Sequence, residues 1–354
     1  MILNMLIQPS NAMQKNILTL SEPFYLERGK KLQSLQIAYH TAGTLNEEGN
    51  NVIWICHALT ANSDVSQWWP GMIGEGRCFD PRHHFIICAN IVGSCYGTTG
   101  PLSKNPKTGQ CYYQDFPEIT IRDMVKAHEH LRKHLGISRI DLLVGGSIGG
   151  FQALEWAIIK PDLPKKMFLL ATSPYASPWA IAFNESQRMA IEADASFSEG
   201  KKYGGKEGMK AARSFALLSY RSYEIYKVSQ ADPDLNLFEG HRASSYQRHQ
   251  GEKLVKRFNA YAYYLLTRAF DTHNVGRNRN GIKTALSQIK AFTLIVGLSS
   301  DGLFPSVEQK FLAEEIPHSR CIIIHSDYGH DGFLVEIKRI TKIVQQTFKQ
   351  LQIV

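Results

Sequence analysis

The sequence predicts an α/β fold, a mostly parallel β-sheet with helices on both faces and an inserted helical lid. Three observations lead to this prediction. Short apolar runs recur along the chain, helical patterns fall between them, and a long segment without a clear strand interrupts this alternation. Strands that alternate with helices are typical of a doubly wound sheet, and a stretch of helices inside such a pattern indicates an insertion.

Six apolar runs are the predicted strands. They cover residues 52–56, 85–89, 140–144, 167–171, 292–296 and 321–325. Because these runs are apolar throughout rather than at every second position, we expect strands of a parallel sheet that is buried on both faces. Apolar stripes at helical spacing predict helices over residues 121–135, 149–159 and 307–316.

The alternation stops near residue 173 and resumes near residue 290. We therefore expect a first core part over 1–172, a helical lid over 173–289 and a second core part over 290–354. Residues 201–290 contain 17 Lys and Arg against 7 Asp and Glu, an excess above the net charge of +8 for the whole chain. Solvation explains such a basic stretch most simply, and no nucleic-acid-binding motif accompanies it, so we expect no nucleic-acid partner.

Length and composition exclude several classes of protein. With 354 residues, 44% of them hydrophobic and 20% charged, the chain is not disordered, collagen-like or a small disulfide scaffold. We expect no membrane partner, because no apolar run reaches about 18 residues and residues 1–7 lack a basic start and a cleavage site. Either Met1 or Met13 fits as the start. The six cysteines form no Cys-x-x-Cys pair, which indicates reduced thiols and a cytoplasmic protein.

A Gly-x-Ser-x-Gly turn contains the candidate nucleophile, Ser147. Residues 145–150 read Gly-Gly-Ser-Ile-Gly-Gly, directly after a predicted strand and at the start of a predicted helix. Small residues on both sides of the serine permit a sharp turn that exposes its hydroxyl, and the helix N-terminus adds backbone N–H donors. A phosphate-binding loop is the alternative, but it requires a lysine after the glycines, and none is present.

A serine nucleophile needs a base, and the base needs an acid that orients it. Asp301 and His330 each follow one of the last two predicted strands, in the chain order that serine, acid and base take in this architecture. Since active sites of open α/β sheets lie at the carboxyl ends of the strands, we expect both side chains near Ser147. Asp301 also fits as a helix cap. Rivals for the two roles lie nearby in the sequence: His325, Asp327 and Asp331.

The acyl oxyanion of such a reaction needs two N–H donors. We expect one from the backbone of Ile148, the residue after the nucleophile, and the other from Leu59, in the loop after the first predicted strand. No metal site is expected. The histidine pairs His83–His84 and His130–His134 have no third ligand near them in the sequence.

Longer motifs surround these residues. They are His57-Ala58-Leu59-Thr60, GTTGP at 97–101, FPEITIRDMV at 116–125, GGSIGGFQALEW at 145–156, FNESQRMAI at 183–191, DGLFP at 301–305 and GHDGFL at 329–334. Together they resemble the homoserine O-acetyltransferase family over about residues 35–335. The resemblance implies an α/β-hydrolase fold with a helical lid, and a triad with Ser147 as nucleophile, His330 as base and Asp301 as orienting acid.

The resemblance also implies a binding site for an amino-acid acceptor. It assigns the carboxylate of the acceptor to Arg213, with Tyr220 beside it, and the ammonium group to Asp331. A cation and an anion at a fixed separation suit a zwitterion, and a guanidinium matches the shape of a carboxylate.

The implied function is transfer of an acetyl group from acetyl-CoA to the hydroxyl of L-homoserine through an acyl-Ser147 intermediate, in methionine biosynthesis. Acyl-CoA and L-homoserine are then the small-molecule partners, no cofactor is expected, and the family implies a homodimer through the lid. Ile148 and Phe151 stand where the family usually has methionine, and Ala61 where it has glycine. A succinyl-CoA donor or a serine acceptor therefore stays open. A serine esterase or thioesterase is the second class of function, and a non-catalytic binding module is the third.

Overall fold

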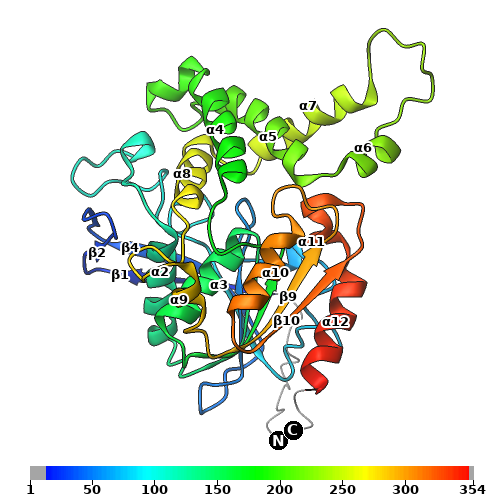
Figure 1. The fold of residues 1–354 in the computed structure, drawn as a ribbon. Coiled ribbons are helices and arrows are strands. Elements are labelled where there is room, and N and C mark those ends of the chain that lie inside the picture. Colours follow the sequence, from blue (N-terminus) through cyan, green and yellow to red (C-terminus); the bar gives the residue numbers. More distant parts are fainter. Residues whose placement is uncertain (1–12, 351–354) are drawn as a thin grey trace, which may run out of the picture.

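The computed structural model describes residues 13–350, so residues 1–7 and the choice of Met1 as start lie outside the described residues. An eight-stranded sheet in the order β1-β4-β6-β5-β7-β8-β9-β10 forms its centre (Figure 1). β4 runs antiparallel to both of its neighbours, whereas every pair from β6 to β10 is parallel. The predicted mostly parallel sheet is confirmed.

All six predicted strands are present, with ends that differ by at most a few residues. The strands are β1 (Gln14–Leu20), β2 (Phe24–Tyr25), β3 (Lys31–Leu32), β4 (Leu35–Ala42), β5 (Val52–Cys56), β6 (Phe85–Ala89), β7 (Ile140–Gly146), β8 (Pro164–Leu170), β9 (Phe292–Leu298) and β10 (Ser319–Ile324). β2 and β3 form a separate small sheet. β1 to β4 are not among the predicted strands, because β2 and β3 are very short, β1 is largely exposed, and β1 and β4 lack a continuous apolar run.

Helices connect the strands and fill the interval between β8 and β9. They are α1 (Val65–Trp68), α2 (Ile121–His134), α3 (Ile148–Ile159), α4 (Pro178–Glu192), α5 (Lys206–Tyr220), α6 (Tyr223–Ser229), α7 (Arg242–Val255), α8 (Ala260–Asp271), α9 (Ile282–Leu286), α10 (Ser306–Glu315), α11 (Gly332–Val335) and α12 (Ile337–Gln350), with 3₁₀ turns η1 (Tyr113–Asp115), η2 (Ala195–Glu199) and η3 (Gly329–Asp331). Local signals fix their starts. Thr120 and Asp123, for example, form a reciprocal capping box at the start of α2.

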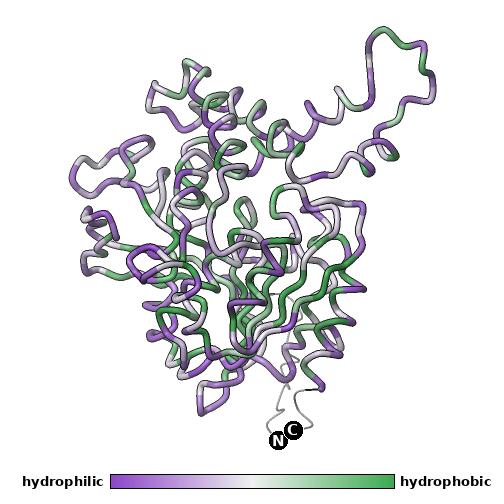
Figure 2. The backbone as a smooth tube through the Cα atoms, in the orientation of Figure 1, coloured by the Kyte–Doolittle hydropathy of each residue, from purple (hydrophilic) through white to green (hydrophobic). Residues whose placement is uncertain are grey.

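Successive residues of the central strands enter two different cores. Trp54 and Leu143 belong to the core under α2, α3 and α10, whereas Ile53, Ile55 and Val144 belong to the core under α1 and α12. Figure 2 shows the resulting apolar interior of the sheet. Burial of each such aliphatic side chain contributes about 1.5–3 kcal/mol, which explains why these strands are apolar at every position.

Helices α4 to α8 form a layer above the carboxyl ends of the strands, which we call the lid (Figure 1). α4 packs on α5 and α8, and α5 packs on α7 and on η3 of the core. α9 instead contacts α3 and α10, beside the sheet. The boundaries at residues 173 and 289 stay a prediction. Among the residues that the structure describes, no helix is long and apolar enough to cross a membrane.

Candidate active site

Ser147 occupies the sharp turn between β7 and α3. Its backbone has φ 55° and ψ −129°, in the positive-φ region that costs a non-glycine residue energy. Close packing holds this conformation. A Cβ at Gly145 would overlap the backbone of Gly149, and one at Gly149 would overlap the carbonyl of Cys56. Two hydrogen bonds add to it, since the Ser147 N–H donates to the β8 carbonyl of Leu170 at 3.0 Å and the Ser147 carbonyl accepts from Thr172 Oγ1 at 2.8 Å.

Three side chains from the ends of β7, β9 and β10 meet in one hydrogen-bonded chain. His330 Nε2 lies 2.9 Å from Ser147 Oγ, and His330 Nδ1 lies 2.8 Å from Asp301 Oδ2. Ser147, Asp301 and His330 are only 7%, 5% and 3% exposed, so water screens these contacts little. Since a carboxylate only accepts, Nδ1 carries the proton and Nε2 is free to accept from the serine hydroxyl.

The Asp301 carboxylate does not cap α10, the other role that the sequence allowed, because Pro305 is the residue before that helix and no side chain bonds there. It stabilises the turn that precedes α10. Its Oδ1 accepts the backbone N–H groups of Leu303 and Phe304, each at 2.9 Å, while Oδ2 contacts the imidazole. The three rival residues have other partners. The Asp327 carbonyl accepts from Ser222, and His325 Nδ1 lies 3.4 Å from a serine hydroxyl at residue 299. Asp331 accepts from Arg221 at 3.1 Å. Among the described residues, Asp301 is the acid that forms a hydrogen bond with the His330 ring.

Two backbone N–H groups beside Ser147 have no acceptor among residues 13–350: those of Leu59 and Ile148. Buried His57 fixes the loop that carries Leu59. Its Nδ1 donates to the Ala58 carbonyl at 2.8 Å, and its Nε2 accepts the N–H of Ile91 at 3.1 Å. Burial lowers the pKa of His57 to about 4, so the ring stays neutral and keeps this pattern at neutral pH.

A cavity of about 400 Å³ opens above the Ser147 hydroxyl. The loop after β5, lid helices α5 and α7, and the His330 loop form its walls. Its lining residues include Leu59, Thr60, Ala61, Trp68, Tyr96, Arg213, Tyr220, Lys253, Arg257, Asp331, Phe333 and Leu334. All three residues of the predicted acceptor site therefore lie in the same cavity as the Ser–His–Asp chain.

Arg213 is available to a ligand. Its guanidinium lies 5.5 Å from the centre of the Tyr220 ring, and it forms no hydrogen bond or ion pair with the other described residues. The Tyr220 ring in turn lies 5.8 Å from the ring of His330. Burial raises the pKa of Tyr220, which keeps its hydroxyl protonated as a donor. Asp331 is held on one side, because its Oδ2 accepts from Arg221 Nε at 3.1 Å.

The sequence analysis missed several cavity residues. Lys253 and Arg257, near the end of α7, add two cations, and Arg257 donates to the Tyr96 hydroxyl at 2.9 Å and to the Thr60 carbonyl. Trp68 adds an apolar wall. Nothing in the sequence separates these two cations from the other basic residues of residues 201–290, because only the packing of α7 brings them over the serine.

The three departures from the family motifs have different positions. Ala61 lines the cavity, so it faces a ligand. Phe151 is fully buried behind it, stacked on His273 with ring centres 3.8 Å apart. Ile148 is also buried, and it is not among the residues that line the cavity. Of the three, Ala61 is the one that alters the shape of the cavity.

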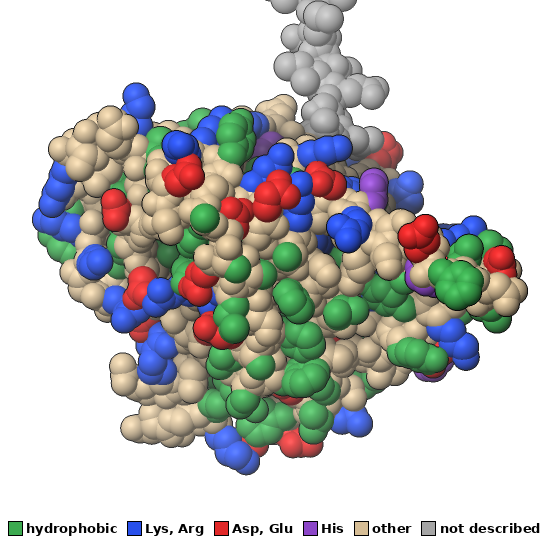
Figure 3. All heavy atoms as spheres, turned by 90° about the horizontal axis from the view of Figure 1, so that it is seen from above, with side chains coloured by type: hydrophobic (Ala, Val, Ile, Leu, Met, Phe, Trp, Pro, Cys, Tyr) green, Lys and Arg blue, Asp and Glu red, His purple; other side chains and the backbone are tan. Residues whose placement is uncertain are grey.

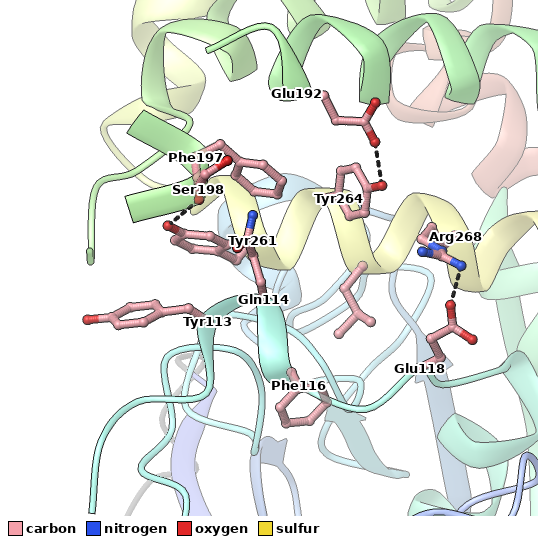
Figure 4. Close-up of a pocket in the computed structure, with 11 residues that line it drawn as sticks. Tyr113, Gln114, Phe116, Glu118, Glu192, Phe197, Ser198, Tyr261, Tyr264 and Arg268 are labelled. Atoms are coloured by element: carbon pink, nitrogen blue, oxygen red, sulfur yellow. Dashed lines mark hydrogen bonds and ion pairs between the residues drawn. The ribbon is translucent and has the colours of Figure 1, made fainter. Parts of the chain in front are cut away.

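A second cavity, of about 330 Å³, lies between the loop around η1 and helix α8 (Figure 4). Tyrosines and phenylalanines line it, and the charged residues that line it already have partners. Arg268 pairs with Glu118, and the Tyr264 hydroxyl donates to Glu192 at 2.6 Å. It contains no nucleophile with a base. In the described part of the chain, no group of three or more His, Cys, Asp or Glu side chains is arranged to hold a metal ion.

Comparison with known proteins adds independent findings. Residues 51–337 match the family model described as alpha/beta hydrolase fold. The chain is 46% identical to the homoserine O-acetyltransferase of Chlorobaculum tepidum over 94% of both chains. The crystal structure of homoserine O-acetyltransferase from Bacillus anthracis superimposes with a TM-score of 0.87 at 26% identity, over 94% of this chain and 97% of that one. An acetylester hydrolase from Corynebacterium glutamicum gives 0.84 at 25% identity, over 95% and 96%.

Proposed function

The chain belongs to the homoserine O-acetyltransferase family of the α/β-hydrolase fold, and we propose that it acetylates the hydroxyl of L-homoserine with acetyl-CoA in methionine biosynthesis. One observation carries this proposal. Arg213, a cation with no hydrogen-bond or ion-pair partner among residues 13–350, and Asp331 line the cavity that contains the Ser147–His330–Asp301 chain. An esterase needs only the triad, whereas a transferase also needs groups that select its acceptor.

In the first half-reaction, Ser147 Oγ attacks the thioester carbonyl carbon while His330 Nε2 takes the hydroxyl proton. Asp301 stabilises the imidazolium through Nδ1. We assign the stabilisation of the negative charge on the acyl oxygen to the N–H groups of Leu59 and Ile148, which have no acceptor among residues 13–350. The C–S bond then breaks, the imidazolium gives its proton to the leaving sulfur, and CoA departs as a thiol.

In the second half-reaction, the homoserine hydroxyl attacks the acyl carbon of acyl-Ser147. His330 Nε2 takes the proton of that hydroxyl and then returns it to Ser147 Oγ as the bond to the serine breaks. Arg213 binds the acceptor carboxylate and Asp331 its ammonium group, which sets the acceptor hydroxyl against the ester. No cofactor enters this scheme. The cations Lys253 and Arg257 at the cavity favour an anionic acyl-CoA donor.

The test is a rapid-mixing assay with the purified enzyme. Acetyl-CoA alone should give a burst of free CoA and an added acetyl group on Ser147 by mass spectrometry, and Ser147→Ala should abolish both. Steady-state assays should then compare acetyl-CoA with succinyl-CoA, each against L-homoserine, L-serine and water. Faster release of acetate into water than of O-acetylhomoserine would favour the esterase function, and a preference for succinyl-CoA or serine would replace the named substrate.

We further propose a cytoplasmic homodimer formed through the lid. The six cysteines of the chain are free thiols, which is consistent with a reducing compartment such as the cytoplasm. Exposed apolar side chains lie on the lid, and apolar atoms are visible on this face in Figure 3. They include Met189 on α4, Phe215 and Leu218 on α5, and Phe238 between α6 and α7. A second copy that buries them would remove this apolar surface from water. Analytical ultracentrifugation should give a dimer for the wild type and a monomer for Leu218→Asp, and a monomeric wild type would refute the dimer.

A further inference from the structure

Arg221 lies where the lid meets the loop that carries His330. It directly follows α5, and its Nε donates to Oδ2 of Asp331 at 3.1 Å. Its guanidinium also lies 5.8 Å from the centre of the Tyr246 ring on α7. The side chains of Arg221 and Asp331 are 28% and 17% exposed, so solvent and salt screen this pair less than an ion pair on the open surface. Arg221 thus joins two lid helices to the acidic residue next to the base.

The backbone at this junction fixes where the Arg221 side chain begins. Gly329 has φ 65°, and a Cβ there would lie 2.7 Å from the backbone nitrogen of Ser222 and 2.8 Å from the carbonyl carbon of Arg221. The Ser222 hydroxyl also donates to the carbonyl of Asp327. Because the two backbones are in direct contact, the guanidinium reaches Asp331 from a defined position.

Asp331 lines the same cavity as a second arginine, Arg213. The charges of both groups act on the pKa of Tyr220, which also lines this cavity. Arg213 forms no ion pair with any residue from 13 to 350, so no other described carboxylate neutralises its guanidinium. If Arg213 and Asp331 formed an ion pair, their charges would neutralise each other, and neither group would be free to bind the acceptor. A zwitterionic acceptor would then have to separate them before it could bind.

We propose that Arg221 is a positioning residue of the acceptor site, which holds the Asp331 carboxylate apart from Arg213 so that the cavity presents an anion and a cation separately. This inference rests on the proposed function, since it takes these two residues as the partners of the acceptor. Loss of Arg221 has two opposing effects. It leaves Asp331 more attractive to an ammonium group, but it frees the carboxylate to pair with a guanidinium already present inside the cavity. We expect the second effect to dominate, because the Arg213 guanidinium is always present in the cavity, whereas the ammonium group of the acceptor must bind from solution.

The test is a double-mutant cycle of Arg221→Gln and Asp331→Asn, read by the homoserine KM and by the CoA burst without acceptor. Arg221→Gln should raise the homoserine KM about tenfold and leave the burst unchanged, because the first half-reaction does not use the acceptor site. In the Asp331→Asn background it should change KM no further, since no carboxylate remains to be positioned. Arg221→Lys, which keeps the charge, should recover part of the affinity. Arg248→Gln removes the same charge from an exposed position of α7 and should match the wild type.

Three outcomes would overturn the inference. Additive losses in the two backgrounds would mean that Arg221 acts independently of Asp331. A lost burst, or a lower kcat at unchanged KM, would mean that it supports the fold or the first half-reaction. Failure of the proposed function is distinguishable, because the wild type itself would then give no burst or no O-acetylhomoserine, and the inference would fail with it.

Discussion

Removal of the Arg213 guanidinium should separate acceptor binding from acyl-enzyme formation. Arg213 is half-buried in the cavity and has no hydrogen-bond or ion-pair partner among residues 13–350. Folding has therefore already removed part of the water around its guanidinium, and ligand binding does not bear that part of the cost. An incoming carboxylate therefore gains nearly the whole charge-assisted interaction. Such a pair in a partly dry site contributes about 2–4 kcal/mol, and Arg213→Ala should raise the homoserine KM about 30- to 1000-fold.

The assay pairs this substitution with a change in the acceptor. L-homoserine amide has no carboxylate charge, so the wild type should bind it much more weakly than L-homoserine, and Arg213→Ala should nearly abolish the difference. Arg213→Lys keeps the charge without the planar fork and should lie between the two. The CoA burst with acetyl-CoA alone should persist in every variant. Slow hydrolysis of the acyl-enzyme should then become the main fate of the acetyl group.

Two results would refute this reasoning. If Arg213→Ala abolishes the burst and leaves the homoserine KM unchanged, the guanidinium serves the acyl donor or the fold. If the variant discriminates between L-homoserine and its amide as strongly as the wild type does, another cation binds the carboxylate. Arg257 and Lys253 are the other cations of the cavity, and the same pair of acceptors tests each of them.

Three further predictions concern the acid, a buried carboxyl and the serine turn. Asp301→Asn should lower kcat by about 10⁴ with an unchanged circular dichroism spectrum, and Asp327→Asn should be mild; the reverse would reassign the acid. Burial, with the charge of Asp301, raises the Glu308 pKa from 4.5 to about 7. Between these two pKa values the folded state keeps a proton that the unfolded chain releases, so the free energy of unfolding falls as pH rises. After solvent screening this fall is on the order of 1–2 kcal/mol. Glu308→Gln should remove it, as measured by urea denaturation at pH 5 and pH 8. Gly150→Ala would overlap Thr172 and cost about 1–3 kcal/mol of stability. Because Thr172→Ala also removes the hydrogen bond to the Ser147 carbonyl, the test is the cost of Gly150→Ala in both backgrounds. The loss of Tm should be smaller in the Thr172→Ala background than in the wild type, and an equal loss would refute the overlap.

The sheet was predictable where its strands are buried on both faces. β5 to β10 each contain an apolar run, because each side of the sheet has its own core. β1 and β4 were not predictable in this way, since they form the antiparallel edge, and β1 alternates exposed and partly buried residues. The lid was recognisable as an interruption, but α9 shows that an interruption in the strand pattern does not mark where one packing unit ends.

The Ser147 turn was predictable because its chemistry is local. The glycines, the preceding strand and the following helix all lie within about a dozen residues, and the structure gives the strained turn that they indicate. Arg221, Lys253 and Arg257 gave no such signal. Each is one basic residue among 17 in residues 201–290. The positions of Lys253 and Arg257 at the cavity, and of Arg221 against Asp331, depend on how α5, α6 and α7 pack over the sheet.

The choice between acyl transfer and hydrolysis depends on how strongly the enzyme favours its acceptor over water. Water is present at about 55 M, so an acceptor at about 1 mM must be favoured roughly 5 × 10⁴-fold at the acyl-enzyme, which corresponds to about 6 kcal/mol. The triad cannot supply this preference, because it treats the two hydroxyl nucleophiles alike. Two charge-assisted contacts of about 2–4 kcal/mol each, from Arg213 and Asp331, are of the required size. On this proposal, residues of the lid and of the His330 loop decide between transfer and hydrolysis, and Arg221 is placed where those two segments meet.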